Sequence, residues 1–133
     1  MNRFLFSILF VLAIVSACSK TGPSSFADEI IGQWEGIKGE CYENGKLVET
    51  ELMEESISLT FASNGNYFIE ADGSIEDSGT FVVSDSYLTL VSKRSGGAHD
   101  TTILKIQTLD RKELILVEPK GEKEYWTYFS RVR

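Results

Sequence analysis

From residue 33 to the end of the chain, hydrophobic and polar residues alternate with a period of two. This period is typical of β-strands that bury one face. The alternation is clearest in residues 56–61, where Ile57, Leu59 and Phe61 share one face and hydroxyl residues occupy the other. Turn residues interrupt the pattern at regular intervals, and Asn44-Gly45 is the strongest hairpin signal among them. The pattern predicts short antiparallel strands with almost no helix.

The predicted strands cover residues 33–42, 46–50, 56–61, 67–71, 77–83, 87–93, 101–109, 113–118 and 123–132, while residues 51–55 form either a helix or a loop. Consecutive hairpins close best as an up-and-down barrel, because closure removes exposed strand edges. We therefore predict an all-β, antiparallel, up-and-down barrel of eight or nine strands, with a two-sheet sandwich as the alternative. The outward positions carry Ser, Thr, Glu and Lys rather than an apolar band, which argues against an outer-membrane barrel.

The first 17 residues differ in composition from the rest of the chain. Arg3 precedes an apolar or small-residue run from Phe4 to Ala17, which is too short for a membrane helix of ~20 residues but suits a signal peptide. The run ends in Val15-Ser16-Ala17-Cys18, which resembles the lipobox of bacterial lipoproteins. That resemblance implies cleavage before Cys18 and acylation of its thiol. An ordinary signal peptide with an incidental Cys is the alternative.

These features divide the chain into three parts. We expect a cleaved lipoprotein signal peptide at residues 1–17, a lipidated Cys18 and flexible tether at residues 18–29, and a barrel domain at residues 30–133. The tether is rich in Gly, Pro and Ser. It has no acidic run directly after Cys18, which favours an outer-membrane lipoprotein of the Gram-negative cell envelope that faces the periplasm.

The charge balance limits the partners. The whole chain has a formal net charge of −7, and removing residues 1–17 takes away one Arg and no acid, which leaves −8. This charge argues against nucleic-acid binding, which needs clustered Lys and Arg. It also argues against electrostatic adhesion to anionic lipid, so membrane attachment would rest on the lipid anchor. The oligomeric state is not indicated by the sequence.

Several short motifs follow one another across residues 30–133. They are Gly32-x-Trp34, Leu59-Thr60-Phe61-x-x-Asn64-Gly65-x-Tyr67, Ser78-Gly79-Thr80-Phe81, Tyr87-Leu88-Thr89-Leu90, Ile106-x-x-Leu109 and Glu113-Leu114-x-Leu116. In this order and spacing they resemble the lipocalin-like domains of bacterial lipoproteins. The resemblance implies that Trp34 closes the barrel floor and that Arg131, or alternatively Arg133, packs over its indole. Such a cation–π contact contributes about 0.5–2 kcal/mol.

An eight-stranded barrel can fill its interior with side chains or hold one small ligand. The candidate ligand contacts are Phe61, Tyr67, Phe81, Leu90, Trp126 and Tyr128. Among them, Trp126 and Tyr128 lie on one face of the last strand and suit a cavity rim, since their polar atoms need partners. We expect a binding or carrier module for a small, partly apolar ligand. The alternative is a filled barrel that acts as a structural or protein-interaction lipoprotein; a large void opening at one end would favour the ligand.

No catalytic constellation is evident, so we expect no enzymatic activity. His99, the only histidine, lies beside Asp100, but neither Ser84 nor Ser95 has the nucleophile-elbow context that a relay requires.

No metal or cofactor motif is evident either, and we expect neither. The carboxylates of Asp72, Glu76 and Asp77 match no calcium-loop spacing, so we interpret them as a solvated acidic turn. Cys41 would have no intramolecular partner if Cys18 is acylated. We expect it to be a small buried hydrophobe, with a reactive thiol as the alternative.

Overall fold

The computed structural model describes residues 24–53, 55–93 and 99–132. Its elements are α2 (Ser24–Glu29), β1 (Gly32–Glu43), β2 (Lys46–Leu52), β3 (Ile57–Phe61), β4 (Asn66–Ala71), β5 (Ser74–Ser84), β6 (Tyr87–Lys93), β7 (His99–Leu109), β8 (Glu113–Lys120) and β9 (Lys123–Arg131). All nine predicted strands are present. Strand β2 continues to Leu52, so the first part of the connection expected as helix or loop is strand instead. Residues 1–17 and Cys18 lie outside the described residues.

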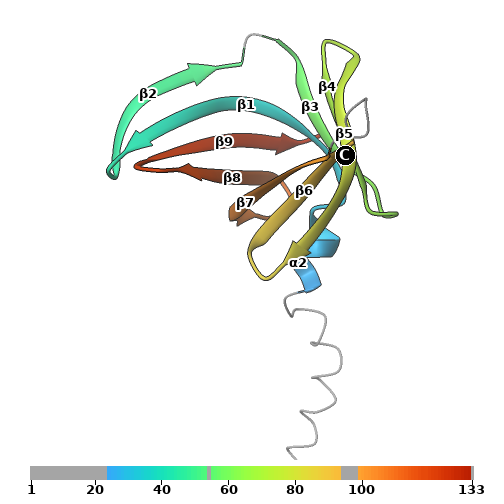
Figure 1. Cartoon of the computed structure of the whole chain (residues 1–133). Coiled ribbons are helices and arrows are strands. Elements are labelled where there is room, and N and C mark those ends of the chain that lie inside the picture. The colour runs from blue at the N-terminus through green and yellow to red at the C-terminus, as the bar shows by residue number, and fades with distance from the viewer. Residues whose placement is uncertain (1–23, 54, 94–98, 133) are drawn as a thin grey trace, which may run out of the picture.

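The sheet closes into a barrel through one long, bent strand. All neighbours pair antiparallel, in the order β2-β1-β3-β4-β5-β6-β7-β8-β9, and β1 also pairs with β9. One edge of β1 pairs first with β3 and then with β2, while its other edge pairs with β9 across a bulge between Gly36 and Lys38. Eight strands therefore form the closed barrel, and β2 is the ninth, added strand (Figure 1). This arrangement confirms the predicted all-β barrel.

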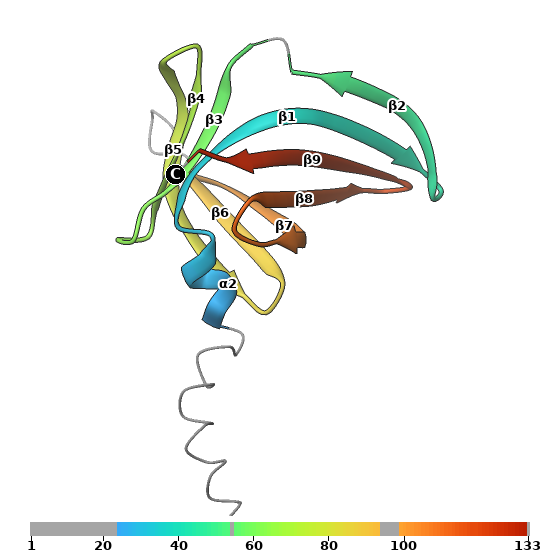
Figure 2. The same ribbon diagram turned by 180° about the vertical axis from the view of Figure 1, so that it is seen from behind.

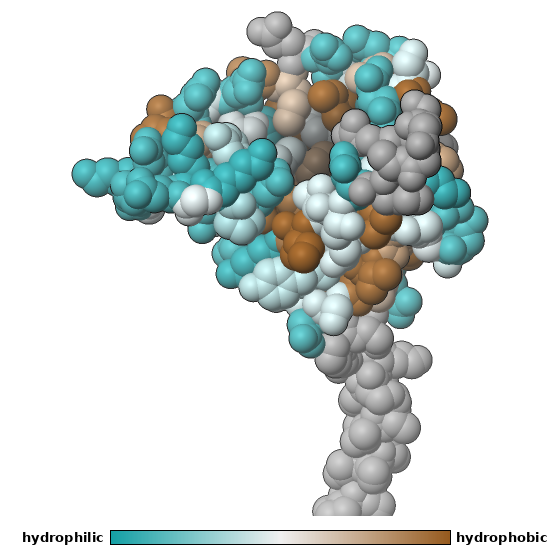
Figure 3. All heavy atoms as spheres, viewed as in Figure 1, coloured by the Kyte–Doolittle hydropathy of each residue, from teal (hydrophilic) through white to brown (hydrophobic). Residues whose placement is uncertain are grey.

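Two hairpins extend beyond the barrel body. The β1–β2 and β8–β9 hairpins sweep together to one side of the molecule, as both ribbon views show (Figures 1 and 2). A hydrogen bond from the Asn44 N–H to the Glu122 carbonyl (3.1 Å) joins their tips. The surface of this extension is mostly hydrophilic in the space-filling view (Figure 3).

The tight turns follow from their residues. Asn44 and Gly45 have φ angles of 52° and 82°, and Asp72 and Gly73 have 51° and 87°. Two successive positive φ angles define the type I′ turn, whose twist matches that of antiparallel strands, and Asn, Asp and Gly tolerate that conformation best.

The two ends of the barrel differ. Strand β1 begins and β9 ends at one end, which we call the floor end, and α2 leads into β1 there (Figure 1). The β1–β2, β4–β5 and β8–β9 turns lie at the opposite end, which we call the mouth. The buried core includes Trp34, Phe61, Leu88, Ile106 and Leu114 and lies toward the floor end. Among the described residues, no helix has the length and apolarity needed to cross a bilayer.

Candidate functional site: a cavity above the Trp34 floor

Trp34 plugs the floor end of the barrel. Its side chain is 0% exposed, and the indole Nε1–H donates a hydrogen bond to the Ile30 carbonyl (2.9 Å). Strand β1 points this residue inward, and Gly32 starts that strand with a φ of 139° that favours glycine. The Arg131 guanidinium lies over the ring, 4.2 Å from the ring centroid to Cζ. The two ends of the domain therefore meet at this contact.

Arg131 also joins the end of β9 to two other backbone segments, through three hydrogen bonds. Its Nε–H donates to the Arg111 carbonyl (2.8 Å) in the β7–β8 turn, and its Nη1 donates to the Ile31 carbonyl (3.0 Å). Its Nη2 donates to the Glu29 carbonyl at the end of α2. A planar guanidinium can satisfy such divergent acceptors because its five N–H groups form a fixed fork. Arg133, the alternative partner of Trp34, lies outside the described residues.

The inward side chains change from apolar to polar between floor and mouth. On β6 the inward series is Leu88, Leu90 and Ser92, and on β8 it is Leu114, Leu116 and Glu118. Strand β7 repeats the series from Ile106 through Leu104 and Thr102 to Asp100. The lower part of each series fills the core. Its upper part surrounds empty space.

This space is a cavity of about 310 Å³. Its apolar wall consists of Leu59, Ile69, Leu90, Leu104, Leu116 and Phe129. Hydroxyl groups come from Tyr67, Ser92, Thr102, Tyr125 and Thr127, and carboxylates from Asp77, Asp100 and Glu118. Tyr67 is 1% exposed whereas Tyr125 is 39% exposed, so the cavity reaches from the core to the solvent at the mouth.

Asp77 is fixed by three neutral hydrogen-bond donors. The Tyr67 hydroxyl donates to Oδ2 (3.0 Å), while the Ser78 N–H (2.9 Å) and the Ser92 hydroxyl donate to Oδ1. The register of β4, β5 and β6 brings these residues together. The prediction of a solvated acidic turn is therefore wrong for Asp77, which lies inside β5 and lines the cavity. Asp72 and Glu76 are exposed.

The predicted pocket residues separate into three groups. Tyr67 and Leu90 line the cavity. Phe61 and Phe81 pack edge to face in the core, with their ring centroids 4.8 Å apart, and are not part of the cavity wall. Trp126 and Tyr128 face the other side of the sheet.

The placement of Trp126 and Tyr128 in the interior is therefore wrong. The Tyr128 hydroxyl donates to Glu40 Oε1 (2.6 Å) on the outer face, and Trp126 packs against Tyr42 at a centroid distance of 5.1 Å. Lys38 completes this outer cluster with a 3.4 Å ion pair to Glu40. Burial and the Glu40 carboxylate raise the pKa of Tyr128, and the hydrogen bond from Tyr128 lowers the pKa of Glu40.

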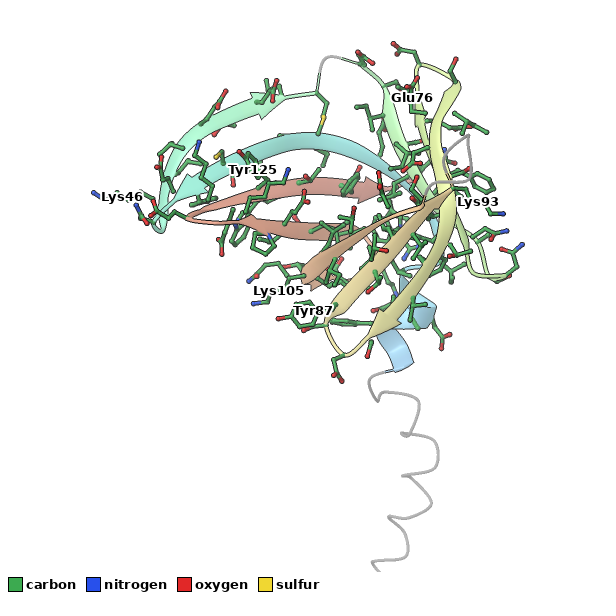
Figure 4. The ribbon with its side chains drawn as sticks, viewed as in Figure 1. Lys46, Glu76, Tyr87, Lys93, Lys105 and Tyr125 are labelled. Carbon is green, nitrogen blue, oxygen red and sulfur yellow. The ribbon has the colours of Figure 1, made fainter. Side chains whose placement is uncertain are left out.

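The inward residues of β9 are instead Tyr125, Thr127 and Phe129. Figure 4 shows Tyr125 near the start of β9, between β1 and β9, in the part of the strand that extends beyond the barrel body. A second, smaller cavity of about 220 Å³ shares Tyr125 and Thr127 and continues past Gly39 and Met53 under the β1–β2 hairpin. Tyr125 therefore stands between the barrel mouth and the concave side of the extension.

The remaining candidates fall outside this site. Cys41 is 9% exposed, which confirms a buried position. Strand β7 includes the backbone of His99, but the His99 side chain lies outside the described part of the chain. Within the described ranges, no three His, Cys, Asp or Glu residues are grouped so that they could hold a metal ion.

Comparisons with known proteins bear on the fold. No protein-family model and no curated protein matches the chain. Among solved structures, a lipocalin-like protein from Bacteroides uniformis matches with a TM-score of 0.57 and 14% identity, over 77% of this chain and 98% of its own. An uncharacterized protein from Bacteroides eggerthii matches over the same shares, with a TM-score of 0.55 and 18% identity. The chain therefore has a lipocalin-like barrel fold, as its motifs indicated.

Proposed function

We propose that this protein binds a small, partly apolar molecule in the cavity at the barrel mouth and acts by binding rather than by catalysis. The cavity above the Trp34 floor is the observation that supports this function over that of a filled barrel. Its volume of about 310 Å³ lies at the lower end of the range of roughly 300–1,000 Å³ for ligand sites. It would hold about ten water molecules at ~30 Å³ each, or one ligand of similar volume.

Blocking the cavity tests the proposal. Thr102 points into the cavity, whereas its neighbour Thr101 is exposed on the other face of β7. Saturable binding of 1-hexanol, measured by calorimetry, should be lost in Thr102→Trp and retained in Thr101→Trp, with both variants checked for cooperative unfolding. The proposal fails if the unmodified protein binds neither 1-hexanol nor its charged six-carbon analogues, or if the two variants bind 1-hexanol equally.

We also propose that a lipid on Cys18 anchors the protein to the envelope membrane, at the outer membrane and facing the periplasm. Residues 18–23, which precede α2, could span at most ~20 Å when extended. Because α2 enters at the floor end, the mouth would then open away from the anchored surface (Figure 1). Cys18→Ala should abolish lipid labelling and leave the precursor unprocessed, while Cys41→Ala should do neither. Normal labelling of the Cys18 variant would refute the anchor.

A further inference from the structure

We propose that the ligand of this cavity is an amphiphilic organic amine, with its cationic group at the Asp77 side of the mouth and its apolar part against the leucine wall. This inference rests on the proposed binding function and specifies its ligand class. The cavity defines the site independently of charge. The charges of its wall decide which ligand it would prefer.

Among the described residues, the charged side chains of the cavity wall all have the same sign. Asp77, Asp100 and Glu118 come from three different strands, and among the residues that the structure describes no Lys or Arg is part of the wall. In the described ranges, the one ion pair within 4 Å is Lys38–Glu40, which lies on the outer face. The Asp77 carboxylate is therefore hydrogen-bonded but has no ion-pair partner there. A bound cation would supply the missing counter-charge, and an anion would be repelled.

The hydrogen bonds of Asp77 prepare it for such a partner. All three donors are neutral, so they fix the orientation of the carboxylate without cancelling its charge. Oδ2 accepts one of these bonds, from Tyr67, and a carboxylate oxygen can accept about two. Among the described donors, one acceptor position of Oδ2 is thus left for an N⁺–H donor, and a preoriented carboxylate loses little freedom on binding.

The aromatic residue at the cavity rim, Tyr125, also favours a positively charged ligand. Tyr125 pairs directly with Glu118 across β8 and β9, so an ammonium group there would meet both a carboxylate and a ring face. Lys120 already places its Nζ 5.7 Å from the Tyr125 ring centroid, although it is exposed and lies outside the cavity wall. A tyrosine face attracts cations through its quadrupole.

The shape of the site favours an organic cation over a metal ion. A divalent cation bound by protein needs several convergent ligands, and in the described part of the chain no three His, Cys, Asp or Glu residues are grouped so that they could hold one. Below the carboxylates the wall is formed by Leu59, Leu90, Leu104, Leu116 and Phe129, which suits an alkyl or aryl group. An amine attached to a short apolar chain complements both regions.

Three probes of equal chain length test the charge preference. Calorimetry on the full-length protein should show that hexylammonium binds at least about tenfold more tightly than 1-hexanol, and that hexanoate binds more weakly than either. The tenfold factor is the smallest gain in affinity expected from one hydrogen bond between charged groups. If 1-hexanol binds and hexylammonium is no tighter, the amine inference is overturned while the binding function stands. If none of the three binds, the binding function itself fails and the inference falls with it.

Charge-removing variants localise the effect. Asp77→Asn keeps the size of the side chain but removes its charge, and it should lower hexylammonium affinity about tenfold relative to 1-hexanol affinity. Asp85→Asn is the matched control, because Asp85 is exposed in the β5–β6 turn at the floor end and its φ of 56° also suits Asn. Glu118→Gln provides a second test that leaves the hydrogen bonds of Asp77 intact. Equal hexylammonium affinity in the Asp77, Glu118 and Asp85 variants would overturn the proposal.

Discussion

Replacing Arg131 by Met tests whether the two ends of the domain hold the barrel closed. Met keeps much of the apolar stem but removes the guanidinium, and with it three hydrogen bonds to backbone carbonyls and the contact over Trp34. Net contributions of about 1 kcal/mol per hydrogen bond and ~0.5–1 kcal/mol for the cation–π contact add to roughly 3–4 kcal/mol. The bond to the Arg111 carbonyl is exposed, so we expect it to contribute least.

Urea unfolding followed by tryptophan fluorescence measures this loss. The variant should remain folded, because a domain of this size has a stability of about 5–15 kcal/mol. Arg111→Met is the matched control, since only the backbone carbonyl of Arg111 serves the contact. It should change the free energy of unfolding by less than about 0.5 kcal/mol. Arg131→Lys should recover only part of the loss, because an ammonium cannot reproduce the fork. A loss below about 1 kcal/mol in Arg131→Met, or one equal to that of the control, would refute this reasoning.

Two further predictions concern the walls of the barrel. Gly79→Ala should destabilise the fold by about 3 kcal/mol in urea unfolding, because a Cβ there would lie 1.9 Å from the Val91 carbonyl oxygen. Gly39→Ala is the control: its Cβ would lie 3.7 Å from the nearest atom, so it should cost under about 1 kcal/mol. Similar losses in the two variants would contradict the close approach at Gly79. Glu40 has a lowered pKa in the folded protein. The stability that it contributes to the fold is therefore present above about pH 4.3 and is lost as the pH falls through the folded-state pKa. Tyr128 has a raised pKa in the folded protein. The stability that it contributes to the fold is therefore present below about pH 10 and is lost as the pH rises through the folded-state pKa. Tyr128→Phe should weaken both trends in unfolding measured across a pH series, and an unchanged pH profile would exclude this hydrogen bond as their cause.

Local patterns in the sequence predict most of this fold. Turn pairs such as Asn44-Gly45 and Asp72-Gly73 end strands because few other residues accept two positive φ angles, and the alternation in residues 56–61 orients β3 correctly. The extent of the added strand β2 does not follow from a local pattern. This strand is exposed along its whole length, so its residues do not alternate between buried and exposed positions. Pairing with β1 decides its extent.

The hydrophobic pattern predicts the wrong inward face for β9, because this strand carries aromatic residues on both faces. Tyr125 and Phe129 point inward, and Trp126 and Tyr128 point outward, so hydrophobicity alone does not fix the phase. The predicted contact of Arg131 with the inward Trp34 is enough to determine which face of β9 points inward. An inward residue at position 131 of a regular strand places positions 129, 127 and 125 inward as well.

The role of Asp77 could not be predicted from local sequence. It follows a turn and another acidic residue, a context in which carboxylates are usually solvated. Only the pairing of β4, β5 and β6 brings Tyr67 and Ser92, 10 and 15 residues away, to its two oxygens. Long-range register of this kind is set by the whole barrel.

Methyl-resolved NMR during a titration with hexylammonium would test ligand binding above the floor most directly. We predict saturable shifts of the Leu90, Leu104 and Leu116 methyl signals, which come from the cavity wall. The methyl signals of Val82 and Ile103, which are 61% and 56% exposed, should not move. Shifts confined to Val82 and Ile103, or no saturable shift at the three leucines, would contradict binding in the barrel mouth.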